Sequence, residues 1–201
     1  ALQVICACLL TAERVVMHNI PDIRDVNRLI ELLEDLGTRV EKLAPGSYAF
    51  EASYIDPAIT ETKAFREKAG SLRGSIMILG PMLARFGRGV VHAPGGDKIG
   101  RRRLDTHFIG LQKLGAKFEY HSEDHSYHVT SPDLKGNYML LDEASVTGTA
   151  NIIMAAVMAK GTTTIFNAAC EPYVAQLCRM LSAMGARITG IGSNLVTITG
   201  V

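Results

Sequence analysis

The residues best suited to chemistry lie in one glycine-rich stretch near the middle of the chain. Asp97 is followed by four cations, Lys98, Arg101, Arg102 and Arg103, and the surrounding glycines and a proline favour a loop. An acid beside side chains that bind anions, at the entry of a helix, predicts a phosphate-handling site. Two simpler readings stay open, because Gly-Gly-Asp is common in turns and arginine clusters are often solvated surface.

A strand and a helix are expected to position this loop. Val90 and Val91 precede it, and β-branched residues favour strands. After the loop, apolar residues recur at helical spacing up to a glycine that suits a C-terminal cap: Leu104, Phe108, Leu111, Leu114 and Gly115. His107 could face the loop, but we expect it on the solvent side of this helix.

The same helix ending appears three times. Leu-Gly or Met-Gly, a small residue, a cation and an apolar residue recur around Gly37, Gly115 and Gly185, which are 78 and 70 residues apart. Each copy is preceded by a short apolar strand and an amphipathic helix. Asn19 and Asn167 both stand 18 residues before their glycine, whereas the middle copy holds the longer loop. An insertion confined to one of three equivalent loops is where chemistry is expected.

A second, more apolar helix is expected before two of these strands, over residues 71–86 and 145–160, with Gly80-Pro81 kinking or shortening the first. Helices that are apolar around most of their circumference belong inside a protein. The order of elements therefore predicts an α/β fold, an inside-out α/β barrel (prism) of three pseudo-threefold repeats with buried helices and outer sheets. We expect residues 1–201 to form one domain whose first repeat lacks its N-terminal part.

The starts of the two apolar helices carry further candidate residues. Arg73 stands near the start of an apolar helix, where its charge needs a partner unless its head reaches water. Ser145, Val146 and Thr147 open the equivalent helix, where hydroxyls and free N–H groups can bind phosphate. A plain N-cap is the favoured reading of Ser145. Because Arg73 and Ser145 occupy equivalent places, their helix starts are expected to converge on one anion pocket.

Composition excludes several classes of partner. The chain is 47% hydrophobic with a net charge of +1, so it has no general attraction for nucleic acid or a membrane surface. Four cysteines without metal-knuckle spacing, Cys6, Cys8, Cys170 and Cys178, indicate reduced thiols in a cytosolic protein, mostly in the core. The histidines of the segment 119–129 alternate as in a polar hairpin with its turn at 122–124, and no metal site is expected there.

The segments LRGSIMILGPMLARFGRGVVHAPGGDKIGRRRLDTHFIGLQKLGAKF and LDEASVTGTANIIMAAVMAKGTTTIFNAACEP resemble the UDP-N-acetylglucosamine enolpyruvyltransferases, and the similarity covers essentially the whole chain. The resemblance implies transfer of enolpyruvate from phosphoenolpyruvate to the sugar 3-hydroxyl, the first committed step of peptidoglycan synthesis. It implies no cofactor and no metal. It also implies a second domain of the same protein, absent from this sequence, that completes the site in a cleft between the two domains.

The resemblance also implies roles for individual residues. Asp97 matches the position of the proton donor, commonly a cysteine, and a carboxylate there implies insensitivity to the epoxide fosfomycin. Arg73 and Arg102 match arginines that bind the phosphate of phosphoenolpyruvate and neighbouring anionic groups. The remaining matches are expected to bind the nucleotide sugar: Arg103, Leu104, Asp105, Thr106, Ser145, Val146 and Thr147. Arg103 departs from the usual proline, and Cys170 and Tyr173 depart from the usual Arg-Glu-Pro-Glu.

Two other functions stay open. The shikimate-pathway enolpyruvyltransferase shares the fold and the phosphoenolpyruvate chemistry but takes an acceptor without uridine. A non-catalytic nucleotide-sugar sensor could be built on the same domain. In either case this chain alone is not expected to turn over substrate.

Overall fold

Helices and strands alternate along the chain, so the expected α/β class is confirmed. The computed structural model describes residues 1–92 and 104–201. Asp97, Arg102 and Arg103 therefore lie outside the described residues, together with the rest of the glycine-rich stretch. The strand before it and the helix after it are both present, as β4 (Arg88–His92) and α5 (Asp105–Lys113).

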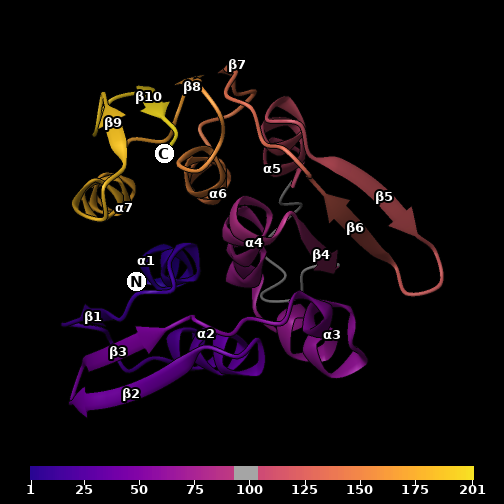
Figure 1. Cartoon of the computed structure of the whole chain (residues 1–201), viewed down its shortest axis with the longest axis vertical. Helices are drawn as coiled ribbons and strands as arrows, with labels where there is room; N and C mark the ends of the chain where they lie inside the picture. Colours follow the sequence, from indigo (N-terminus) through magenta and orange to yellow (C-terminus); the bar gives the residue numbers. More distant parts are fainter. Residues whose placement is uncertain (93–103) are drawn as a thin grey trace.

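Three sheets share one strand order, in which the third strand lies between the first and the second and pairs antiparallel with both. Figure 1 shows the three sheets at separate places on the outside of the molecule. The first sheet consists of β1 (Val15–Met17), β2 (Arg39–Ala44) and β3 (Ser47–Glu51), with the helix α2 (Arg24–Asp35) between β1 and β2 in the chain. The second consists of β4, β5 (Lys117–His121) and β6 (Ser126–Thr130), with α5 between β4 and β5 in the chain.

The third sheet repeats this order and adds one strand at its edge. Strand β7 pairs parallel with β8, and β8, β10 and β9 then follow as in the other two sheets. Its elements are β7 (Tyr138–Leu140), β8 (Thr162–Phe166), α7 (Pro172–Ala183), β9 (Arg187–Thr189) and β10 (Leu195–Thr199). Pro172 opens α7, where a missing N–H group costs no helical hydrogen bond.

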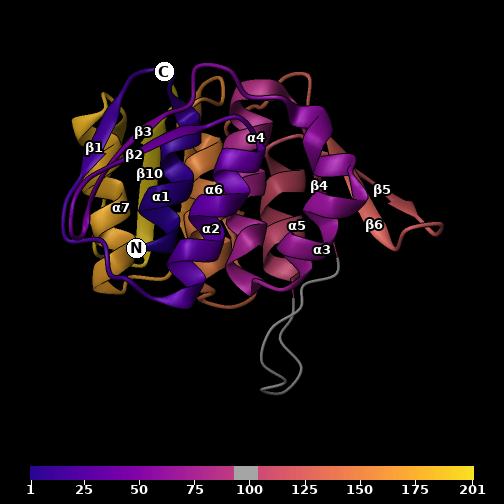
Figure 2. The ribbon, with the colours of Figure 1, turned by 90° about the horizontal axis from the view of Figure 1, so that it is seen from below.

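The central helices are the most apolar ones. Figure 1 shows α1, α4 and α6 in the middle of the molecule, and Figure 2 shows them running side by side. In α6, every residue from Gly148 to Ala156 is buried. The three segments are α1 (Leu2–Ala7) with the short 3-10 helix η1 (Cys8–Leu10), η3 (Arg73–Ile78) with α4 (Leu79–Phe86), and α6 (Val146–Ala156). The buried side chains of these helices form the centre of the hydrophobic core.

The predicted break at Gly80-Pro81 is present. A 3-10 helix, η3, runs from Arg73 to Ile78, and the α-helix α4 begins only at Leu79. Pro81 thus lies in the first turn of α4, where its missing N–H group removes no helical hydrogen bond. The connection before η3 is also irregular, with the 3-10 helix η2 (Pro57–Glu61) followed by α3 (Lys63–Gly70).

The three equivalent glycines have the same backbone conformation. Gly37, Gly115 and Gly185 have φ angles of +109°, +105° and +109°, which an L-residue rarely adopts. Asn19 and Asn167, which the sequence pattern also paired, have φ angles of +59° and +62°. The sequence signature therefore marks one local conformation that ends three helices.

Three of the four cysteines are buried in the hydrophobic core. Cys6, Cys8 and Cys178 are buried and unpaired, while Cys170 is exposed. Burial raises the pKa of Cys8 to about 12 and that of Cys178 to about 11, and it raises the pKa of Cys6 as well. No helix within the described ranges is both long and apolar enough to cross a membrane.

Candidate functional site

A cavity of about 490 Å³ lies where η3, α5 and α6 begin. Five residues singled out in the sequence line it, namely Arg73, Leu104, His107, Ser145 and Thr147. The two helix starts that hold Arg73 and Ser145 therefore meet at one cavity. Leu104 is the first residue after the glycine-rich stretch, so the chain leaves that stretch at the cavity wall.

The start of α6 presents hydrogen-bond donors. Ser145 is the N-cap, as its sequence favoured, and its Oγ accepts a hydrogen bond of 3.1 Å from the backbone N–H of Gly148. The N–H groups of Val146 and Thr147 have no acceptor among the described residues. Two free N–H groups at the positive end of an 11-residue helix can bind an anionic oxygen.

The described lining of the cavity is not positive overall. Arg73 is its one cation and is half-buried, while Asp25 and Glu143 are exposed carboxylates on the same wall. Among the described residues, the groups here that suit an anion are the Arg73 side chain and the N–H groups at the start of α6. The sequence supplies four further cations between Lys98 and Arg103, directly before Leu104.

Three predicted substrate-binding residues do not line the cavity. Asp105 is exposed at the start of α5, and Val146 is half-buried at the start of α6. Thr106 is buried, and its Oγ1 donates a hydrogen bond of 2.9 Å to Oδ1 of Asp142. Thr106 thus joins α5 to the segment before α6. It stabilises the wall of the cavity without lining the cavity itself.

His107 was expected on the solvent side of its helix, and this prediction is wrong, because its side chain is only 2% exposed. It lies on the same face of α5 as Gly110, which approaches α6 so closely that a Cβ atom there would lie 2.1 Å from Cδ1 of Ile152. Burial, and to a lesser extent the positive charge of Arg73, lowers the pKa of His107 to about 4. The imidazole is therefore neutral near pH 7.

Asn151, which the sequence analysis did not single out, lies behind the cavity and contacts His107 of its lining. It is fully buried in the middle of α6 and makes three hydrogen bonds across helix interfaces. They join it to the N–H of Gly80, the carbonyl of Ile76 and Nδ1 of His107, at 2.6, 3.1 and 3.1 Å. The sequence does contain a signal for this role. Asn151 is a polar residue inside an apolar helix, so when buried it must find hydrogen-bond partners.

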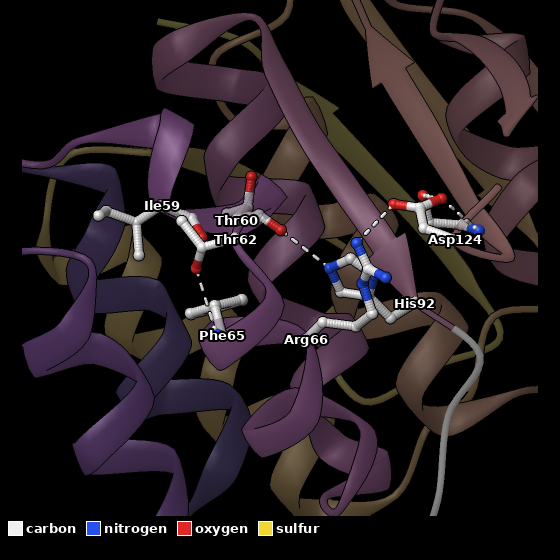
Figure 3. A network of polar contacts seen from close by, with 8 residues as sticks. Ile59, Thr60, Thr62, Phe65, Arg66, His92 and Asp124 are labelled. Carbon is white, nitrogen blue, oxygen red and sulfur yellow. Dashed lines mark hydrogen bonds and ion pairs between the residues drawn. The ribbon is translucent and has the colours of Figure 1, made fainter.

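A polar network holds the strand that enters the glycine-rich stretch (Figure 3). Nε2 of His92, the last residue of β4, lies 2.8 Å from the carbonyl oxygen of Thr60. Beside it, Nη2 of Arg66 donates a hydrogen bond of 2.8 Å to Oδ2 of Asp124. Burial lowers the pKa of His92, so the neutral ring donates its Nε2 proton to Thr60. The network joins η2, α3, β4 and the turn between β5 and β6.

The predicted polar hairpin is confirmed, with strands β5 and β6 joined by a turn at 122–125. The rings of His121 and His128 stack on its surface with their centroids 3.8 Å apart. Within residues 1–92 and 104–201, no group of three His, Cys, Asp or Glu side chains is placed to hold a metal ion.

The chain is similar to proteins of one enzyme class along its whole length. UDP-N-acetylglucosamine 1-carboxyvinyltransferase of Bacteroides fragilis is 62% identical over 200 residues, which are 100% of this chain and 46% of that protein. The proteins of the same name from Porphyromonas gingivalis and Treponema denticola are 56% and 45% identical over 201 residues, again 100% of this chain and 46% of each. The chain thus spans about half the length of these relatives.

Solved structures share the fold at much lower identity. The enolpyruvyl transferase NikO from Streptomyces tendae superposes with a TM-score of 0.82 at 18% identity, covering 100% of this chain and 46% of that one. EPSP synthase from Acinetobacter baumannii gives a TM-score of 0.70 at 19% identity over 99% of this chain and 45% of that one. A family model described as EPSP synthase (3-phosphoshikimate 1-carboxyvinyltransferase) matches residues 1–201. The chain therefore belongs to the EPSP synthase (3-phosphoshikimate 1-carboxyvinyltransferase) family.

Proposed function

We propose that this chain is part of an enzyme that transfers enolpyruvate from phosphoenolpyruvate to the 3-hydroxyl group of UDP-N-acetylglucosamine. The observation that carries the proposal is the identity of 45–62%, over the whole chain, with proteins named UDP-N-acetylglucosamine 1-carboxyvinyltransferase. The product is the first committed intermediate of peptidoglycan synthesis, and the reaction needs no metal or cofactor.

The reaction is an addition followed by an elimination. The oxygen of the sugar hydroxyl bonds to the enol carbon of phosphoenolpyruvate and its own proton leaves to a base, while a second proton goes to the methylene carbon, which gives a tetrahedral phospho-ketal. This intermediate then loses phosphate and a proton from its methyl group to restore the double bond. We assign the protonation of the methylene carbon to Asp97, because a carboxyl group can act as a general acid when burial raises its pKa.

Cations and helix-start donors would hold the two substrates. We assign Arg73 and Arg102 to the phosphate of phosphoenolpyruvate and its neighbouring anionic groups. The nucleotide sugar would contact the segment from Arg103 to Thr106 and the turn from Ser145 to Thr147. Support for this placement comes from the cavity that Arg73, Leu104, Ser145 and Thr147 line together, and from the open N–H groups at the start of α6.

We further propose that residues 1–201 form one domain, an inside-out α/β barrel of three pseudo-threefold repeats. The shared strand order of the three sheets and the matching φ angles of Gly37, Gly115 and Gly185 support the repeats. The central helices and outer sheets support the inside-out arrangement. The rest of a protein about twice this length would supply the second domain, and the two domains would work together in the cytoplasm.

The proposal is tested in the full-length gene product by following phosphate release from phosphoenolpyruvate. Release that requires UDP-N-acetylglucosamine is expected. The family model is described by the shikimate reaction, so release that requires shikimate 3-phosphate instead would support 3-phosphoshikimate 1-carboxyvinyltransferase activity. Nucleotide-sugar binding without phosphate release under any condition would indicate a sensor.

A substitution at Asp97 tests the role of the carboxyl group. Asp97→Asn keeps the size of the side chain but removes its acid, so turnover should fall by about 10²-fold or more, with nucleotide-sugar binding retained. Asp133→Asn is the matched control, because Asp133 pairs with Lys160 and does not line the cavity. Near-normal turnover in Asp97→Asn would remove the carboxyl group from the proton-donor role.

A further inference from the structure

Two backbone groups fix the orientation of the Asn151 side chain. The N–H of Gly80 can only donate, so the side-chain atom 2.6 Å from it must be the oxygen, Oδ1. The carbonyl of Ile76 can only accept, so the atom 3.1 Å from it must be the nitrogen, Nδ2. Turning the amide over would place donor against donor and acceptor against acceptor in a fully buried position.

The orientation of Asn151 in turn fixes the proton on His107. The second hydrogen of Nδ2 points to Nδ1 of His107 at 3.1 Å, so this ring nitrogen must be an acceptor without a proton. The neutral ring then carries its proton on Nε2. That proton is donated to Oγ1 of Thr147 at 3.1 Å. The backbone of η3 and α4 thus determines, through one amide, which tautomer His107 adopts.

The last member of this chain of hydrogen bonds faces the cavity. Thr147 is exposed and lines the cavity, and its hydroxyl has no other partner among the described residues. Because the hydroxyl already accepts a hydrogen bond from His107, its own proton remains to be donated. It sits beside the open N–H groups of Val146 and Thr147, so three donors gather at the start of α6.

We propose that Asn151 and His107 are positioning residues that make the Thr147 hydroxyl a hydrogen-bond donor to an anionic oxygen bound in the cavity. The inference rests on the proposed function, because it takes the diphosphate of UDP-N-acetylglucosamine as that anion. It adds two buried residues and a defined proton arrangement to the site. The charged side chains that line the cavity with His107 are Asp25, Arg73 and Glu143, and Arg73 opposes protonation of the ring.

The tautomer is tested directly by two-bond ¹H–¹⁵N correlation spectra of the full-length protein labelled at histidine nitrogens. The chain contains six histidines, so the spectrum of His107→Gln identifies the signals of His107. We expect a neutral ring protonated on Nε2 near pH 7, with and without nucleotide sugar. A ring protonated on Nδ1, or on both nitrogens, would overturn the proposal. This measurement needs no ligand and no catalytic activity.

The consequence for binding is tested by calorimetry with UDP-N-acetylglucosamine. Thr147→Val removes the hydroxyl but keeps the side-chain shape, and about tenfold weaker binding is expected for loss of one hydrogen bond to a charged group. Thr147→Ser keeps the hydroxyl, so its affinity should stay within about twofold of the unsubstituted protein. Thr147 is exposed, so neither substitution removes a core contact.

Asn151→Asp probes the orientation without touching the cavity. A carboxylate accepts a hydrogen bond from Nδ1–H, so Nε2 would lose its proton and accept a hydrogen bond from the Thr147 hydroxyl, which could then no longer donate to the bound anion. Binding should then weaken about as much as in Thr147→Val. In the spectrum, the proton of His107 should move from Nε2 to Nδ1.

These experiments distinguish a failure of this inference from a failure of the proposed function. No binding of UDP-N-acetylglucosamine by the unsubstituted protein would refute the proposed function, and the spectrum alone would then decide the proton arrangement. Normal affinity in Thr147→Val would overturn the inference and leave the proposed function intact. Equal weakening in Thr147→Val and Thr147→Ser would also overturn it, because the hydroxyl would not be the group that matters.

Discussion

Oδ1 of Asn151 accepts a hydrogen bond of 2.6 Å from the backbone N–H of Gly80, across the contact between α6 and α4. The two helices are so close here that a Cβ atom on residue 80 would lie 2.4 Å from the backbone oxygen of Asn151. It would also lie 2.5 Å from Oδ1. The absence of a side chain at Gly80 and the polar side chain at Asn151 are therefore parts of one contact.

Gly80→Ala should force α4 and α6 apart and break this hydrogen bond. The expected loss is about 2–4 kcal/mol of unfolding free energy, from overpacking together with a buried unpaired amide. Urea unfolding followed by circular dichroism measures it. Gly74→Ala is the control, because its Cβ would meet only the ends of two flexible side chains, those of Leu2 and Met77. Equal stabilities of the two variants would contradict the close approach.

Two glycines with the same φ angle should respond differently to alanine. Gly37→Ala would place a Cβ atom 2.1 Å from the backbone oxygen of Tyr54, whereas nothing lies within 4 Å of a Cβ atom at Gly185. Gly185→Ala should therefore cost only the backbone strain, about 1–2 kcal/mol, and Gly37→Ala clearly more. Thermal unfolding of both variants gives the comparison. An equal loss of stability in the two variants would mean that the close contact with Tyr54 does not contribute to the effect of Gly37→Ala.

His107 should make stability depend on pH. Its pKa is about 4 in the folded state against an ordinary value of 6.5, so the unfolded chain binds more protons between these values. Stability should therefore fall as pH drops from 6.5 toward 4, by about 3 kcal/mol from this group. His92, whose pKa is also lowered, contributes in the same direction.

The contribution of His107 is isolated by its substitution. Unfolding free energy measured at several pH values should have a smaller slope below pH 6.5 in His107→Gln than in the unsubstituted protein. The slopes are compared rather than the absolute stabilities, because the substitution also disturbs the hydrogen bonds to Asn151 and Thr147. Unchanged slopes would show that His107 is not buried in its neutral form.

The proposed role of Asp97 carries a prediction about inhibition. The epoxide fosfomycin reacts with a thiolate, and a carboxylate is a much weaker nucleophile toward it. The full-length enzyme should therefore keep its activity after incubation with fosfomycin, and Asp97→Cys should become sensitive. Mass spectrometry of the incubated variant checks for a single adduct. An adduct on the unsubstituted protein at residue 97 would contradict this prediction.

Local patterns in the sequence predicted most of the helices and strands. The spacing of Val26, Leu29, Ile30 and Leu33 is that of one helical face, and this face is buried in α2. The hairpin at 117–130 and the break before Leu79 followed from equally local chemistry. These predictions succeeded because neighbouring residues decide the conformation of such segments.

The buried polar residues were harder to predict, because their partners lie far along the chain. His107 stands four residues before Leu111 and seven before Leu114, so its spacing did place it on the inner face, but its polarity argued for solvent. Asn151 finds its partners 71 and 44 residues away, at Gly80 and His107. Only the packing of α4, α5 and α6 brings these groups together.

Within residues 1–201, the distribution of the four cysteines favours labelling at one place. Thiolates rather than thiols react with maleimides, and burial keeps Cys6, Cys8 and Cys178 protonated and out of reach of the reagent. Cys170 alone is exposed, two residues before α7 begins. A fluorophore could therefore be attached beside this helix without removing any native cysteine, giving an optical reporter on the folded chain.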